Sequence, residues 1–154
     1  MTRSRYDEAI AAIDAVHAED PEKDAGEAKE LAYARRMSAW LEKLAPDASE
    51  ALRLATRCQH LRRWAIARGA YPEGKIGYLR WRKEEALAHA ALAGEILGRA
   101  GYDEEAVKHV QSLIKKERIK HDPEAIAENY WQLHLQPRSA WTHELDLRPW
   151  MEAW

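Results

Sequence analysis

Residues 49–65 read SEALRLATRCQHLRRWA, and their apolar side chains recur every three or four positions. This spacing places side chains on one face of an α-helix. Asp47 or Ser49 can cap the helix at its N-terminus, and Glu50 follows Asp47 at the distance found in a capping box. The segment therefore predicts a helix that turns one face toward a core. The residues on that face are Ala51, Leu54, Cys58, Leu61 and Ala65.

The residues before this segment predict two further helices. The first has Ile10 and Ile13 on its apolar face and stops before Pro21, because proline cannot continue a helix. The second runs over about residues 25–45 and is followed by another proline. Its apolar stripe consists of Tyr33, Met37, Trp40 and Leu44.

The residues after the segment predict a break and then more helices. Glycine and proline are dense over residues 69–77, which disfavours a helix there. A fourth helix is predicted over residues 78–99, and Asp103 can cap a fifth. Asp122 followed by Pro123 is typical of the start of a sixth. The chain is thus predicted to be all-α, a single compact bundle of five or six helices.

The character of the sequence changes toward the C-terminus. Four of the seven tryptophans lie in the last 24 residues, where helical periodicity is poor. We therefore expect one helical domain over residues 1–136 and an irregular or docked tail over residues 137–154. Because large apolar patches on a surface usually mark interfaces, this tail is a candidate for self-association.

Composition and charge narrow the class of protein. Cys58 is the only cysteine, so no internal disulfide can form, and no apolar run reaches the roughly 18 residues of a membrane span. We therefore expect a cytoplasmic protein without a membrane partner. The formal net charge is −2, yet residues 53–83 hold nine Lys and Arg side chains against one acidic residue, Glu73. This local excess favours an anionic partner, although solvated helix faces would give the same pattern.

Two histidines lie on regular stripes on either side of the predicted break. His60 shares a stripe with Arg57 on the third helix, and His89 shares one with Arg82 and Glu85 on the fourth. If the two helices are antiparallel neighbours, two imidazoles and a carboxylate come together. This donor set suits a divalent transition metal such as Mn, Zn or Fe. The arginines would hold a phosphate in a fork.

Two other interpretations of these residues remain open. Histidines on the flank of a helix are often structural, and the 29 positions between His60 and His89 do not force them to meet. The basic, tryptophan-containing segments 62–64 and 80–83 could instead bind nucleic acid through phosphate contacts and stacking. The isoelectric point of about 6.4 makes a nucleic-acid partner the weaker alternative.

Several short motifs follow one another in a fixed order over about residues 5–125. They are ELAYARRMSAWLE (30–42), QHLRRW (59–64), YP (71–72), GYLRWR (77–82), HA (89–90), IL (96–97) and GYD (101–103). In this order they resemble an uncharacterised helical family, domain of unknown function 4202.

That family in turn resembles the HD-type metal phosphohydrolases, which are all-helical and bind metal through a His, a His-Asp pair and a later Asp. The resemblance implies that His60 takes the place of the first histidine and His89 that of the second. Ala90 stands where the aspartate of the pair would be, which removes one ligand. The acidic pair expected after the fifth helix is also missing, and Glu128 is a candidate substitute.

These observations lead to one functional hypothesis with two alternatives. The hypothesis is an HD-like, metal-dependent phosphohydrolase that takes a phosphorylated or otherwise anionic small molecule. The alternatives are a non-catalytic anion-binding or protein-interaction module, which the missing aspartates favour, and a nucleic-acid-binding protein. The residues assigned to the site are His60 and His89 as metal ligands, Glu85 as the catalytic residue, and Arg57, Arg63, Arg80 and Arg82 as ligand-binding residues.

Overall fold

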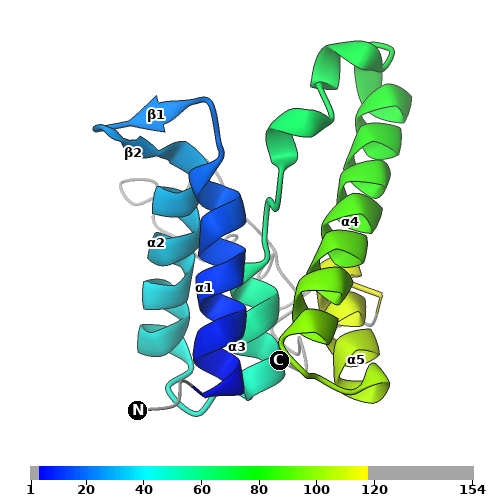
Figure 1. Cartoon of the computed structure of the whole chain (residues 1–154). Coiled ribbons are helices and arrows are strands. Elements are labelled where there is room, and N and C mark those ends of the chain that lie inside the picture. The colour runs from blue at the N-terminus through cyan, green and yellow to red at the C-terminus, as the bar shows by residue number, and fades with distance from the viewer. Residues whose placement is uncertain (1–3, 118–154) are drawn as a thin grey trace, which may run out of the picture. The chain divides into compact units, whose positions relative to one another are not determined.

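The computed structural model describes residues 4–117 of the chain. In this part, successive α-helices run in alternating directions, as Figure 1 shows. A short hairpin lies between the first two helices, and two 3-10 turns precede the fourth. The elements are α1 (Arg5–Ala18), β1 (Lys23–Asp24), β2 (Glu27–Ala28), α2 (Lys29–Leu44), α3 (Glu50–Arg57), the 3-10 turns Arg63–Ala65 and Arg68–Ala70, α4 (Gly74–Arg99) and α5 (Glu104–Lys115).

Helix α1 begins with a capping box. The Ser4 hydroxyl accepts a hydrogen bond from the Asp7 N–H at 3.1 Å, and the Asp7 carboxylate accepts from the Ser4 N–H at 3.3 Å. Side chains four residues apart then lie on one face, so Ala9, Ile13 and His17 are all buried. The predicted first helix is confirmed.

The start of α2 differs from the prediction, because residues 23–28 form an antiparallel hairpin. Ala25 and Gly26 make its two-residue loop, with φ of 49° and 90°, and positive φ at both positions is typical of a tight hairpin turn. The helix therefore begins at Lys29 rather than near residue 25. Its predicted apolar stripe is only partly covered, since Trp40 and Leu44 are exposed.

Asp20 holds the N-terminus of α2 from outside the helix. Ala28 occupies the N-cap position and has no side-chain acceptor to offer. The buried carboxylate of Asp20 accepts instead from the N–H groups of Glu22 and Glu30, each at 2.9 Å. This contact fixes the first turn of α2 to the segment that follows α1.

Helix α3 is the predicted third helix, but it is shorter than expected. Ser49 rather than Asp47 caps it, since the Ser49 hydroxyl accepts from the Leu52 N–H at 3.2 Å. Of the predicted core positions, Leu54, Cys58 and Leu61 are buried, Ala51 is half-buried and Ala65 is exposed.

The early end of α3 has a cause outside the helix. The Nε2–H group of His17 donates to the carbonyl oxygen of Arg57 at 2.9 Å, which gives that acceptor a partner from α1. His60 and Arg62 then adopt left-handed backbone conformations, with φ of 65° and 54°. The predicted stripe of Arg57 and His60 is therefore not a face of a helix.

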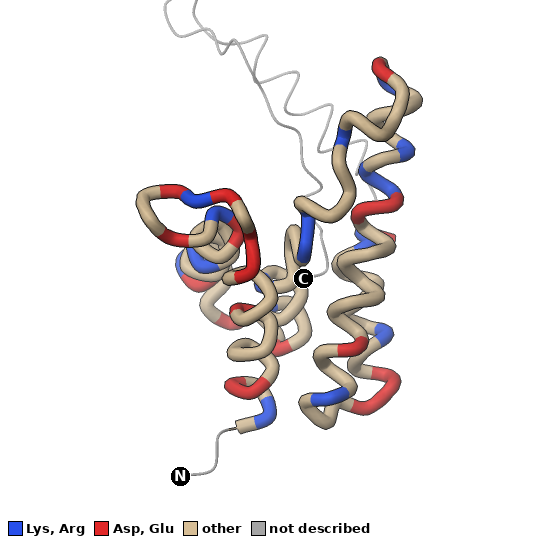
Figure 2. The backbone as a smooth tube through the Cα atoms, turned by 45° about the horizontal axis from the view of Figure 1, so that its top comes forward, with Lys and Arg blue, Asp and Glu red and all other residues tan. Residues whose placement is uncertain are grey.

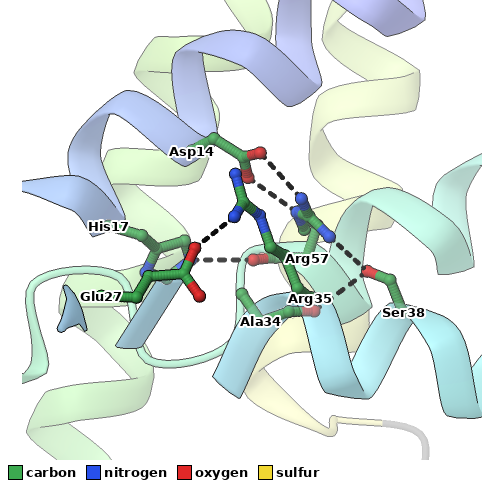
Figure 3. A network of polar contacts seen from close by, with 7 residues as sticks. All are labelled: Asp14, His17, Glu27, Ala34, Arg35, Ser38 and Arg57. Carbon is green, nitrogen blue, oxygen red and sulfur yellow. Dashed lines mark hydrogen bonds and ion pairs between the residues drawn. The ribbon is translucent and has the colours of Figure 1, made fainter. Parts of the chain in front are cut away.

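The side chain of Arg57 joins three helices, as Figure 3 shows. Its Nε and Nη2 both donate to the Asp14 carboxylate of α1 at 2.7 Å, and its Nη1 donates to the Ser38 hydroxyl of α2 at 3.1 Å. The side chains of Arg57 and Asp14 are only 11% and 22% exposed. Removing one partner of such a covered fork typically costs about 3–5 kcal/mol. The pair thus fixes the end of α3 against α1 and α2.

Helix α4 begins earlier than predicted, at Gly74, and its glycines have a structural reason. Gly74 has φ of +85°, and a Cβ on Gly77 would lie 1.8 Å from the carbonyl oxygen of Pro72. One turn later, the indole N–H of Trp81 donates to the Ile66 carbonyl oxygen at 2.9 Å. The glycine- and proline-rich segment is therefore a close reversal attached to α4.

Helices α4 and α5 pack against each other and complete the core. Gly101, with φ of 85°, follows the end of α4, and the Asp103 carboxylate caps α5 by accepting from the Ala106 N–H at 2.8 Å. The end of α4 at Arg99 and the cap by Asp103 are as predicted. Helix α5 also contacts α3, and α1 contacts α4. The core consists of Ala9, Ile13, Leu54, Ala55, Cys58, Leu61, Ala90, Ala93, Ile96, Leu97, Tyr102, Val110 and Ile114.

The prediction of an all-α bundle is confirmed for residues 4–117. The sixth helix, Glu128, the boundary at residue 136 and the tryptophan-rich tail lie outside the described residues. None of the helices within residues 4–117 is long and apolar enough to cross a membrane.

Gly77→Ala tests the close reversal before α4. We expect it to lower the free energy of unfolding by about 2 kcal/mol or more, because the new Cβ would collide with the Pro72 backbone. Gly98→Ala on the same helix meets no heavy atom within 4 Å and should raise stability by about 0.5–1 kcal/mol. Urea unfolding followed by circular dichroism measures both changes, and effects of the same sign would contradict the reversal.

Candidate functional site

A cluster of polar and aromatic side chains lies where α2, the segment after α3, and α4 meet. Trp81, Glu85 and His89 follow each other at intervals of four residues, so they share one face of α4, and all three are buried. We refer to this group as the histidine cluster. It consists of Glu30 and Tyr33 of α2, His60 and Arg63 of the segment after α3, and Trp81, Glu85 and His89 of α4.

His60 is held by α2 at both its edge and its face. Its Nδ1 lies 3.0 Å from Oε2 of Glu30, and because a carboxylate accepts, Nδ1 donates. The ring of Tyr33 stacks on the imidazole, with centroids 4.4 Å apart and planes inclined by 12°. These contacts place the imidazole of His60 6.3 Å from that of His89, measured between ring centroids. The predicted meeting of the two histidines is therefore present, although not through a helical stripe.

His89 and Glu85 each carry a buried atom without a hydrogen bond. Among the described residues, Nε2 of His89 and Oε1 of Glu85 have no hydrogen-bond partner. Burial, aided by the charges of His60 and Arg63, lowers the pKa of His89 to about 4. Burial raises the pKa of the Glu85 carboxyl, although Arg63 opposes the rise. His89 is thus neutral at pH 7 and has a nitrogen without a partner, which folded proteins rarely leave in their interior.

Two of the predicted arginines lie beside Glu85. Arg63 places its Nε 3.7 Å from Oε1 of Glu85, and its guanidinium lies 5.6 Å from the centroid of the Trp81 ring. The charge of Arg82 also acts on Glu85, where it opposes the rise in pKa that burial causes. Arg80 is five residues before Glu85, which puts it roughly 140° around the helix from that residue. Arg80 and Arg82 are both exposed.

Arg57 is the exception among the predicted ligand-binding residues. Its Nε, Nη1 and Nη2 atoms all donate within the bundle, to Asp14 and Ser38 (Figure 3). Three of its five N–H groups, at least one on each nitrogen, therefore already have partners within the bundle. We assign Arg57 to the packing of α3 and leave it out of the site.

Four basic residues of the central segment, Lys75, Arg80, Arg82 and Lys83, lie on the first turns of α4. Figure 2 shows Lys and Arg along the approach to α4 and along its first turns. Further back, Arg53, Arg57 and Arg62 form ion pairs with Glu42, Asp14 and Glu19. The basic side chains that remain for an anionic partner therefore lie mainly on the α4 side of the histidine cluster.

The donor atoms of the cluster fit a divalent metal in part. A neutral imidazole with a free nitrogen is a common ligand for such metals, and His89 provides one. Within residues 4–117, however, no group of three or more His, Cys, Asp or Glu side chains is placed to hold a metal ion. The described residues thus offer two imidazoles, and further ligands would have to come from the rest of the chain, from water or from a bound anion.

Glu30 and His17 are buried polar residues that no motif marks. The signal that could have found them is a polar side chain on an apolar helix face. Glu30 lies four residues before the buried Ala34 of α2. His17 lies four residues after the buried Ile13 of α1. Such positions favour apolar residues, so an acid or a histidine there indicates a specific partner.

Comparison with known proteins shows the family of the chain. The family described as a domain of unknown function (DUF4202) matches residues 7–129, which include every member of the histidine cluster. The chain belongs to this family. No curated protein and no solved structure matches it.

The lowered pKa of His89 predicts a pH-dependent loss of stability in the metal-free protein. The unfolded chain protonates this histidine near pH 6.5 and the folded chain only near pH 4, so stability is lost as the pH falls through this window. Between pH 7 and pH 5 this residue alone should remove about 2 kcal/mol from the free energy of unfolding. His89→Gln should abolish that part of the loss, whereas His109→Gln, at an exposed position on α5, should not. Urea unfolding at pH 7 and pH 5 measures the free energy of unfolding of each protein. The same pH dependence in the wild type, His89→Gln and His109→Gln would refute the expectation.

Proposed function

We propose that the histidine cluster binds a divalent transition metal together with a phosphorylated or otherwise anionic small molecule, and that the protein is phosphohydrolase-like. The observation that carries the proposal is the buried, unpartnered Nε2 of His89, on an imidazole 6.3 Å from that of His60. His60 and His89 would hold the metal. When bound, the metal would supply Lewis-acid polarisation of a phosphoryl oxygen.

The other residues of the cluster have roles that follow from their contacts. Arg63 is 3.7 Å from Glu85, which is too long for a good hydrogen bond, so its planar fork has donors to offer an anion. Arg82 adds an exposed positive charge on the same side of α4. Burial raises the pKa of Glu85, so this carboxyl is suited to hold a proton closer to neutral pH and to orient water or ligand. Arg80 belongs to the outer part of the positive segment.

A non-catalytic anion-binding module is the second candidate. Two observations favour it: Ala90 lies where the aspartate of a His-Asp pair would be, and residues 4–117 hold no set of three metal-binding side chains. Arg63 and Arg82 would then bind the anion without a reaction. Nucleic-acid binding has less support, because Trp81 is buried and its indole N–H is bonded to Ile66, so it is not free to stack on bases. Self-association through the C-terminal tail and a cytoplasmic location stay predictions.

Calorimetric titration of the metal-free protein with Zn²⁺ and Mn²⁺ tests the proposal. We expect about one ion per chain in the wild type, and a loss of affinity of at least about tenfold in His60→Ala and in His89→Ala, since each removes a ligand. His109→Ala is the matched control, because it removes an exposed histidine from α5. Absence of binding by the wild type, or equal affinity in all variants, would rule out the metal site.

The same proteins decide between the two candidate functions. Hydrolysis of a phosphate monoester that depends on the added metal and on both histidines would support a phosphohydrolase. Stabilisation by inorganic phosphate without turnover under any divalent metal would assign the chain to the non-catalytic class.

A further inference from the structure

Glu30 is a buried carboxylate in contact with His60 to which the proposed function gives no role. Its side chain is only 11% exposed and that of His60 only 18%. Its backbone is fixed as well, because its N–H donates to the buried Asp20 carboxylate at 2.9 Å. The carboxylate of Glu30 is thus held in place against His60 from the start of α2.

The hydrogen bond between the two residues decides which nitrogen of His60 is free. Nδ1 lies 3.0 Å from Oε2 of Glu30 and must carry the proton, because the carboxylate can only accept. In the neutral imidazole the lone pair is then on Nε2. Histidines that bind metals commonly donate their other ring N–H to a carboxylate, which fixes the tautomer and the orientation of the ring.

Two further observations indicate that the orientation of His60 is set by its surroundings. Its backbone has φ of 65°, a left-handed conformation that is unfavourable for a non-glycine residue and persists only where neighbouring groups enforce it. Tyr33, three residues after Glu30 on α2, stacks on the face of the imidazole. Residues of the first turns of α2 therefore fix the imidazole of His60 in two ways: Glu30 bonds to its edge and Tyr33 stacks on its face.

We propose that Glu30 is a positioning residue, which keeps the proton of His60 on Nδ1 and so presents Nε2 to the metal. This inference rests on the proposed metal site. Glu30 itself would not touch the metal, because its contact is with the opposite edge of the imidazole. The role is specific to Glu30 and not to acidic residues of this region in general, since the nearby Glu27 pairs with Arg35 instead.

Long-range ¹H–¹⁵N spectra of the histidine side chains, combined with Zn²⁺ titration, test this role. The wild type should show His60 protonated on Nδ1, with the signals assigned by comparison with His60→Ala. Glu30→Ala should lose this preference and bind Zn²⁺ about 10- to 100-fold more weakly. Glu30→Gln retains an acceptor oxygen, so it should keep the tautomer and lose less affinity. Glu27→Ala is the control and should change neither quantity.

The outcomes separate this inference from the proposal on which it rests. A folded Glu30→Ala protein with unchanged tautomer and unchanged Zn²⁺ affinity would overturn the role of Glu30, and so would a wild type with the proton on Nε2 of His60. A wild type that binds no Zn²⁺ would refute the metal site instead. In that case the tautomers of the metal-free variants would still show whether Glu30 sets the proton. If Glu30→Ala does not fold, the wild-type tautomer of His60 still tests the inference, because a proton on Nε2 would overturn it.

Discussion

The guanidinium of Arg57 donates to Asp14 and Ser38 while the carbonyl oxygen of the same residue accepts from His17. One residue therefore joins α3 to α1 and α2 through both its side chain and its backbone. Because the carbonyl is engaged by His17, α3 ends there and the chain turns through the left-handed conformation of His60. That turn brings His60 to the first turn of α2 and to α4. The position of the histidine cluster thus depends on a contact among helices that is not itself part of the site.

The interior of the described bundle divides into two parts of different character. One is an apolar core of α1, α3, α4 and α5 side chains, which stabilises the fold by burial. The other contains Glu30, Glu85, His89 and His17, all buried. Polar groups in such a place are costly unless they are hydrogen-bonded, yet atoms of Glu85, His89 and His17 have no hydrogen bond among the described residues. Burial of this kind contributes little to stability, so a ligand is the better physical reason for its presence.

Much of the fold could be predicted from local patterns. The apolar face of α1, the cap of α5 by Asp103, the helix end before Gly101 and the burial of Cys58 all depend on residues close together in the sequence. The end of α3 could not be predicted in this way, because it depends on His17, 40 residues before Arg57. The start of α4 at Gly74 could not be predicted either, because glycine usually disfavours a helix, whereas here Gly77 is required by the close approach of the Pro72 backbone.

The sequence predicted most of the residues that form the site, but not the way in which the backbone brings them together. His60, His89, Glu85 and Arg63 do lie together, but His60 arrives through a left-handed turn and not along a helix. Spacing along one helix places Arg57 among the ligand-binding residues, whereas the structure pairs it with Asp14 on another helix, 43 residues away. Contacts of this range leave no trace in the spacing of residues along one helix. A buried acid on an apolar face, such as Glu30, is the one signal that remains visible in the sequence.

The most direct test of a metal site between the two histidines is a crystal structure of the protein grown with Zn²⁺, in which anomalous scattering locates the ion. The metal site proposed here predicts a strong peak about 2.0–2.1 Å from Nε2 of both His60 and His89. Peaks confined to exposed histidines such as His109, with none between His60 and His89, would contradict it.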